Sequence, residues 1–247
     1  MKLARQHIQQ RQEQFAESRF FRRLSSKTTA AGALAFVPGM TFFVMTFQDI
    51  LRLNESRVQD LTLRAIVHHH RREDSGHDLW FLQDLAAIDG GLPDVRSLFS
   101  PTDTVTRDVA FGLMSEVFRA TDDRVRITIP LVLEATGHVF FHQVVAYLDR
   151  INYEVPLKYF ARGHLDVELS HELFEREMNA VLESLVMTDK ERAPVLGMID
   201  RSFDLMTSML DALDERTDIG PPVSTTLPRP KSVATSSPAF AAIRRAQ

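Results

Sequence analysis

The chain contains no cysteine among its 247 residues. Without thiol groups it can form no disulfide, no thiolate metal site and no cysteine nucleophile. Such a composition is compatible with a reducing compartment, and we expect a cytoplasmic protein. Any protein ligands to a metal ion must then be histidine and carboxylate side chains. Those ligands suit iron or manganese and, on ligand type alone, zinc.

An excess of positive charge is also lacking. The chain carries 29 Lys and Arg residues against 33 Asp and Glu residues, for a formal net charge of −4 at pH 7. We therefore expect no nucleic-acid partner, although the first forty residues are locally basic. No internal repeat and no glycine-rich phosphate loop is visible. With 44% hydrophobic residues, the chain can bury one sizeable core, which favours a single domain plus tails.

Long hydrophobic runs are scarce, and only the segment from Ala30 to Phe47 raises the question of a membrane span. Pro38 and Gly39 interrupt this segment, its threonines dilute it, and no second such segment follows. The pattern favours a buried core helix that begins near Pro38 and continues through Leu51. We therefore expect no membrane partner.

The N-terminal segment also lacks the compact apolar stretch of a secretory signal. Residues 1–23 are rich in Gln, Arg and Glu, with apolar residues at helical spacing. They predict an amphipathic arm that docks on a helical domain spanning 24–216. The remaining segment, 217–247, is rich in Pro, Ser, Thr and Ala, and is predicted to be a disordered tail.

The most informative motif present is His164-x3-Glu168-x2-His171. On a helix these three residues fall within roughly 60° of one another and extend over roughly 10 Å of the axis. That spread is awkward for one ion but suits two neighbouring ions with the carboxylate between them. The alternative interpretation is a solvated helical face, on which Glu and His are common.

A second histidine-rich region lies in the stretch from Glu55 to Ile88, which we expect to form one long helix ending at Gly90-Gly91. Three consecutive histidines at 68–70 cannot all face one site, so at most one or two do. His70, Asp74 and His77 share a face, and Glu73 competes with Asp74 as a ligand. Gly76 would cost such a helix about 1 kcal/mol relative to Ala.

A third set of ligand types lies on the helix predicted after Asp122 or Asp123, in which Pro130 should cause a kink or a restart. Glu134, His138 and His142 recur there at intervals of four, among apolar neighbours. A carboxylate among apolar neighbours is costly unless it is paired or bound to metal, so Glu134 is the strongest ligand candidate of the three. The two histidines are better explained as core or outer-sphere groups, with His138 kept as a second-tier ligand.

The remaining segments show plain helical patterns. A helix is predicted over Thr102–Ala120, capped by Thr102 or Asp103, and two more over 172–187 and 190–213. The methionines of the last segment fall at regular helical spacing, which indicates a core stripe rather than a copper site.

Together these motifs resemble those of the haem-oxygenase-like non-haem diiron oxidases and oxygenases, a family of iron-containing redox enzymes, over about residues 20–215. In that family an early carboxylate and His, a Glu on a middle helix and a His-x3-Asp-x2-His helix hold two irons that activate O2. The resemblance implies an all-α bundle of about seven helices and no catalytic residues beyond the metal ligands. The implied ligands are Asp74, His77, Glu134, His164, Glu168 and His171, with Glu73, His70 and His138 as a second tier.

Two departures from the family pattern stand out: Glu168 occupies a position that is usually Asp, and the early carboxylate could be Glu73 or Asp74. Sister families fit less well. Haem oxygenases use a His on the first long helix, and this chain has no His between His7 and His68. Thiaminase-like proteins need a Cys. Ferritin-like proteins pair two Glu-x2-His motifs but do not explain His164.

The expected function is therefore O2-dependent oxidation of a small molecule that resembles an amino acid or a fatty acid, by N-oxygenation, desaturation or C–C cleavage. Iron, as two ions, and O2 are the implied cofactor and co-substrate. An electron donor and a second copy of the chain are the partners left open. The alternative is a non-catalytic helical protein of the same fold that binds an organic ligand or a partner chain.

Overall fold

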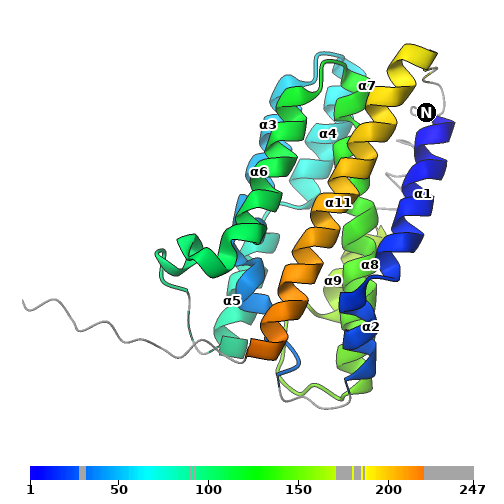
Figure 1. Cartoon of the computed structure of the whole chain (residues 1–247). Helices are drawn as coiled ribbons and strands as arrows, with labels where there is room; N and C mark the ends of the chain where they lie inside the picture. The colour runs from blue at the N-terminus through cyan, green and yellow to red at the C-terminus, as the bar shows by residue number, and fades with distance from the viewer. Residues whose placement is uncertain are drawn as a thin grey trace, which may run out of the picture.

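The computed structural model describes residues 1–27, 32–89, 91, 93–170, 180, 185 and 187–219. Within these residues the chain is helical and contains no strand, as the all-α prediction requires (Figure 1). Helices α1, α3, α6, α8 and α11 run along the length of the bundle, with α3 packed on α6, and α11 packed on α6, α8 and α1. The α-helices are α1 (Lys2–Ala16), α2 (Arg19–Ser26), α3 (Val37–Arg57), α4 (Leu61–Glu73), α5 (His77–Asp89), α6 (Thr104–Arg119), α7 (Asp123–Arg126), α8 (Thr128–Arg150), α9 (Arg162–Ser170) and α11 (Asp189–Ile219).

Helix α3 is the core helix expected from the sequence, since Pro38 lies in its first turn and Leu51 is buried. A proline is tolerated there because the first N–H groups of a helix have no intrahelical partner. The aromatic core lies beside it. Phe36, just before α3, packs edge-on against Phe20, Phe140 and Phe160, which come from α2, α8 and the segment before α9.

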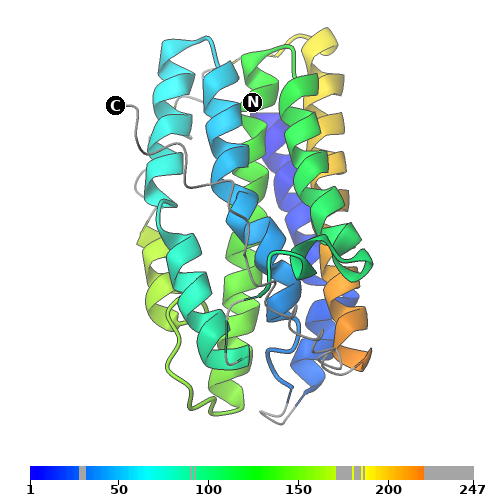
Figure 2. The ribbon, with the colours of Figure 1, turned by 90° about the vertical axis from the view of Figure 1, so that its left-hand side faces the viewer.

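The single helix predicted over residues 55–88 is wrong, because the structure divides this stretch among three helices. Helix α3 ends at Arg57, and the Asp60 side chain caps α4 by accepting hydrogen bonds from the N–H groups of Thr62 and Leu63. Helices α4 and α5 then follow one below the other beside α3, separated by a turn (Figure 2). In that turn Gly76 has φ +95°, a backbone conformation that favours glycine. Gly76 is therefore required by the turn and is not a cost to a helix.

The predicted restart near Pro130 is confirmed. Asp122 caps the short helix α7 by accepting a hydrogen bond from the Arg124 N–H, and α8 begins at Thr128. Pro130 then falls in the first turn of α8. The residues from Asp123 to Arg150 form the one stretch of the described chain that is long and apolar enough to cross a membrane, and 61% of its most apolar window is buried. Such burial fits a core helix of the bundle.

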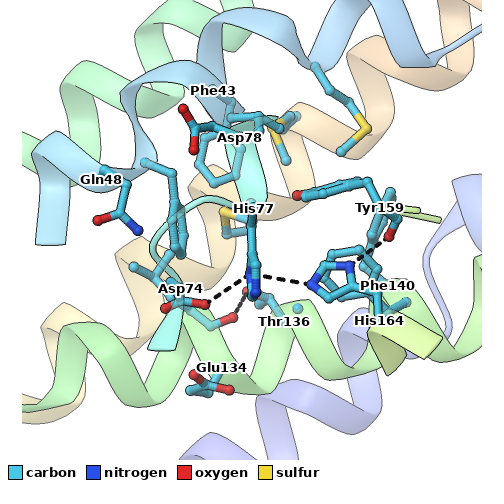
Figure 3. Close-up of a pocket in the computed structure, with 18 of the residues that line it drawn as sticks. Phe43, Gln48, Asp74, His77, Asp78, Glu134, Thr136, Phe140, Tyr159 and His164 are labelled. Carbon is cyan, nitrogen blue, oxygen red and sulfur yellow. Dashed lines mark hydrogen bonds and ion pairs between the residues drawn. The ribbon is translucent and has the colours of Figure 1, made fainter. Parts of the chain in front are cut away.

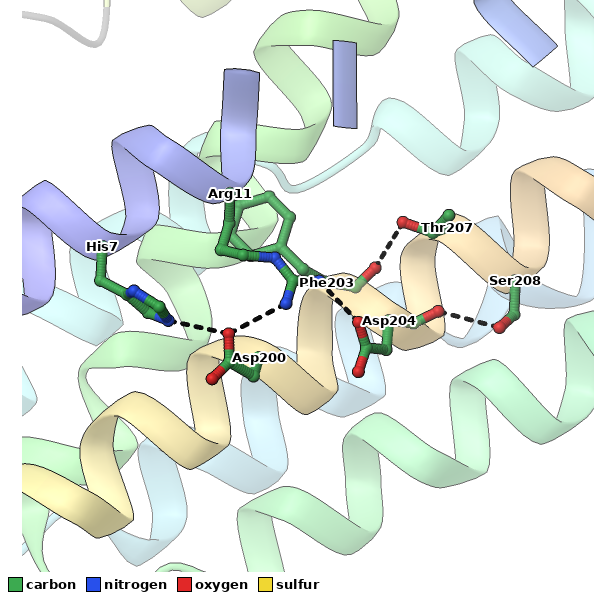
Figure 4. Close-up of polar contacts among 7 residues, drawn as sticks. All are labelled: His7, Arg11, Asp200, Phe203, Asp204, Thr207 and Ser208. Atoms are coloured by element: carbon green, nitrogen blue, oxygen red, sulfur yellow. Dashed lines mark hydrogen bonds and ion pairs between the residues drawn. The ribbon is translucent and has the colours of Figure 1, made fainter. Parts of the chain in front are cut away.

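The N-terminal arm forms two helices rather than one, with α1 ending before Glu17. Its apolar residues are buried, except for Leu3, which is exposed. Polar contacts also fix α1 to α11 (Figure 4). Arg11 binds Asp200 at 2.9 Å and Asp204 at 2.5 Å, and His7 Nε2 lies 2.8 Å from Asp200 Oδ1. These contacts hold α1 against α11.

Helix α6 begins after Asp103, close to the predicted start, and the apolar stripe of α11 is buried as the sequence indicated. Helix α11 runs to Ile219, so it enters the segment predicted as tail. Residues 220–247, and most of the helix predicted over 172–187, lie outside the part of the chain that the structure describes.

Candidate metal centre

A cluster of histidine and carboxylate side chains faces a pocket in the middle of the bundle (Figure 3). The break between α4 and α5 is what brings several of them together. Helix α4 carries His70 in its last turn, Asp74 follows as the C-terminal cap, and α5 begins with His77. Glu134 comes from α8 and His164 from α9. The five side chains thus come from four helices and one turn.

Three of these side chains form a compact group. His70 Nδ1 lies 2.8 Å from Glu134 Oε1, and His70 Nε2 lies 3.4 Å from Asp74 Oδ2. One ligand atom from each of the three residues falls within 4.8 Å of the others, a spacing that would suit a shared metal ion. His70 and Asp74 are buried, and Glu134 is partly buried.

A second group shares Asp74 with the first. His77 Nδ1 lies 3.6 Å from Asp74 Oδ1 and 3.3 Å from His164 Nε2 (Figure 3). When two nitrogens bind the same ion at about 2.1 Å each, in neighbouring coordination positions, they lie about 3 Å apart. The observed spacing fits such a pair. The two oxygens of Asp74 therefore face two different imidazoles.

The orientation of His164 is fixed by its own loop. His164 Nδ1 lies 2.6 Å from the Tyr159 carbonyl oxygen, and because a carbonyl can only accept, Nδ1 carries the proton. Nε2 then holds the lone pair that faces the cluster. A hydrogen bond of this kind on the far nitrogen is what usually orients a metal-binding histidine.

Asp84 in turn holds that loop. Its carboxylate accepts hydrogen bonds from the backbone N–H groups of Lys158 at 2.7 Å and Phe160 at 3.0 Å, on either side of Tyr159. Burial raises the pKa of Asp84 above its ordinary value of 3.8, and the backbone hydrogen bonds offset part of that rise. Sequence reasoning missed Asp84. The available signal was a lone carboxylate between Phe81 and Leu85, two apolar residues that are also buried.

Aromatic rings confine the two facing imidazoles. His77 stacks on Trp80, with ring centroids 4.8 Å apart, and meets His164 edge-on at 4.4 Å. Phe141 packs against the other imidazole, that of His164, also at 4.4 Å. This packing restricts rotation of both rings, so the ring nitrogens keep their direction.

The pocket beside the cluster contains about 830 Å³ of empty space, including its open mouth. Its walls are mostly Phe, Met, Leu and Val side chains from α1, α3, α8 and α11. No Lys or Arg occurs among the described residues that line it. Buried carboxylates are costly unless they are paired or bound to metal, and Asp74 and Glu134 both lie next to imidazole nitrogens of His70. The available O and N donors suit iron or manganese and, on ligand type alone, zinc.

Of the implied ligands, the structure brings together Asp74, His77, Glu134 and His164, and it adds His70 from the second tier. Glu168 lies on α9, but its side chain is outside the described part of the structure, as is the whole of His171. These two positions therefore stay predictions.

The other second-tier residues lie elsewhere. Glu73 pairs with His69 at 3.0 Å and does not line the pocket, so the early carboxylate at the cluster is Asp74. His138 and His142 are exposed and stack on each other, with ring centroids 6.5 Å apart. The expectation that they are core or outer-sphere groups is wrong, because they fall on the face of α8 that is turned to solvent.

Comparison with known proteins yields a structural match only. No family model matches the chain, and no curated protein matches its sequence. A crystal structure of a domain of unknown function with a heme oxygenase-like fold, from Shewanella denitrificans OS217, superimposes with a TM-score of 0.63. The match covers 88% of this chain and 93% of the other, at 16% sequence identity. The chain therefore has the haem-oxygenase-like fold, built around a group of His, Asp and Glu side chains that could hold a metal ion.

Proposed function

We propose that the chain is an O2-dependent oxidase or oxygenase that binds iron at the cluster and oxidises a small molecule held in the adjoining pocket. The observation that supports this proposal is the shared position of Asp74 between two imidazole groups at the wall of an apolar cavity. A purely structural cluster of charged groups would not need a cavity beside it. An enzyme that uses O2 needs both a metal-binding cluster and a cavity for its substrate.

In this proposal His70, Asp74 and Glu134 would hold one iron ion, and His77 and His164 would hold a second. Glu168 and His171 would complete the ligand set. Bound ferrous iron supplies the electrons that activate O2 toward a C–H or N–H bond. The chain's own contribution is to fix the ligand geometry through Tyr159 and Asp84 and to keep water away with the apolar walls.

Anaerobic loading with ferrous iron tests the proposal. Wild type should bind up to two iron ions and should consume O2 when air is admitted. Glu134→Ala and His164→Ala should each stay folded and lose iron affinity by about 10-fold or more, because each removes a ligand. His138→Ala is the matched control, since it removes an exposed histidine from α8, the helix that carries Glu134.

Less than one iron per chain in wild type, or full iron binding by both ligand variants, would overturn the proposal. The pocket would then be left as the functional feature, and the protein would be a non-catalytic scaffold that binds an apolar ligand. Binding of an apolar fluorescent probe by metal-free protein, without any effect of iron, would be the result expected of that alternative.

A further inference from the structure

The polar residues of the pocket that do not belong to the cluster are few, and two of them carry strong hydrogen-bonding groups. Gln48 comes from α3 and Asp78 from α5. Figure 3 shows both on the side of the pocket away from Glu134, with Asp78 next to Phe43. Apolar side chains make up most of the surrounding wall. The two residues therefore mark a polar spot on a wall that is otherwise apolar.

The amide nitrogen of Gln48 is buried and has no hydrogen-bond partner among the described residues. A buried N–H group without an acceptor is costly, and native structures seldom leave one. Because Gln48 lines the cavity, the missing acceptor can come from a molecule in the pocket.

Asp78 presents a carboxylate to the same cavity. It is partly buried, and the structure records no hydrogen bond or ion pair between it and any described residue. The described lining holds no Lys or Arg that could pair with it. The cavity therefore disfavours an anionic group near Asp78 and favours a cationic one.

We infer that the pocket takes an apolar amine, with its protonated nitrogen at Asp78 and an oxygen acceptor beside the amine at the Gln48 amide. This inference rests on the proposed function, because it names the substrate class for the same site. It selects the amino-acid-like substrate over the fatty-acid-like one. An eight-carbon amine such as octylamine contains the apolar and cationic parts, and 2-aminooctanamide adds a neutral oxygen acceptor beside the amine.

Calorimetric titration of the metal-free full chain separates the contribution of the cationic nitrogen from that of the apolar chain. Wild type should bind octylamine at least 10-fold more tightly than octanoate, with the neutral octanol in between. Asp78→Asn should weaken octylamine by about 10-fold and leave octanol unchanged. Asp108→Asn, on the exposed face of α6, is the matched control and should alter neither affinity.

Gln48→Leu tests whether the Gln48 amide donates a hydrogen bond to the ligand oxygen. Wild type should bind 2-aminooctanamide more tightly than octylamine, and Gln48→Leu should abolish that preference while octylamine affinity stays within about threefold. Retention of the preference in Gln48→Leu would overturn the role of Gln48.

Three results would overturn the role of Asp78: octanoate bound as tightly as octylamine, no binding of octylamine at millimolar concentration, or equal losses of octylamine and octanol in Asp78→Asn. None of these titrations uses iron. A failure here therefore leaves the iron-loading result intact, and a failure of iron loading leaves the amine preference measurable.

Discussion

Asp84 shows how far a metal centre can depend on a residue that does not touch it. Its two backbone hydrogen bonds hold the loop whose Tyr159 carbonyl orients His164. Hydrogen bonds to a charged group contribute about 1.5–3 kcal/mol each, and loss of an outer-sphere partner typically weakens metal binding about 10- to 100-fold. Asp84→Ala should therefore lower the free energy of unfolding by roughly 3 kcal/mol and also weaken iron binding.

Chemical denaturation of metal-free protein and an anaerobic iron titration measure these two effects. Asp84→Asn gives a graded comparison, because its single carbonyl oxygen can accept one of the two hydrogen bonds while its NH2 group faces the other donor. Iron affinity that stays at the wild-type value in Asp84→Ala would show that His164 keeps its orientation without this loop contact.

Gly76 and Gly137 allow the effect of a single added methyl group to be compared at two positions. Both have open space where a Cβ would lie, but Gly76 has φ +95° and Gly137 lies within α8. Ala at 76 should destabilise the fold by about 1–2 kcal/mol, since L-residues disfavour that conformation. Ala at 137 should instead stabilise it by about 0.5–1 kcal/mol through helix propensity. Opposite shifts of the melting temperature are expected, and a stabilising effect of Gly76→Ala would mean that the turn between α4 and α5 is absent.

At the scale of elements, the closest approach of α6 and α11 is made where α6 has no side chain. A Cβ built on Gly112 would lie 2.7 Å from Leu205 Cδ2 and 2.9 Å from Cδ1. The end of the Leu205 side chain must therefore shift to admit Ala at position 112, and this shift should offset part of the roughly 1 kcal/mol that helix propensity contributes. In a Leu205→Ala background Gly112→Ala should be more stabilising, by up to about 1 kcal/mol, because only helix propensity remains. A double-mutant cycle by denaturant unfolding measures this difference, and equal effects in both backgrounds would contradict the close contact.

Helix periodicity in the sequence predicted the elements whose burial is regular, such as α3, α6 and α11. The cost of a carboxylate among apolar neighbours singled out Glu134, which the structure places beside His70 at the pocket. Periodicity could not predict the turn at Gly76, because His70, Asp74 and His77 share a face on a continuous helix as well. It missed Asp84 because the partners of that residue are backbone N–H groups more than seventy residues away.

At the scale of the whole molecule, acid stability depends on carboxylates that join separate helices. Burial alone would raise the pKa of Glu55, but hydrogen bonds from His68 and Arg71 hold it below 4.5. Burial would likewise raise the pKa of Asp123, yet hydrogen bonds from the Asp60 N–H, Arg126 and the Gln59 N–H hold it below 3.8.

A depressed pKa in the folded state means that the unfolded chain binds protons more readily. The stability supplied by Glu55 and Asp123 is therefore present above pH 4.5 and 3.8, and is lost as the pH falls through their lower folded values. Denaturation of metal-free protein from pH 7 to pH 3 should show this loss. The double variant Glu55→Gln, Asp123→Asn should be less stable at pH 7 and show a shallower decline, and an unchanged slope would place acid sensitivity elsewhere.

Separate helices carry His70 and His77, on either side of the turn at Gly76. A turn on the surface of two packed helices tolerates an inserted or deleted residue better than the interior of a helix does. Such a change would move His77 relative to His70 and Glu134, which lie on α4 and α8. A single short insertion or deletion in the gene could thus alter one side of the cluster while the other side keeps its place.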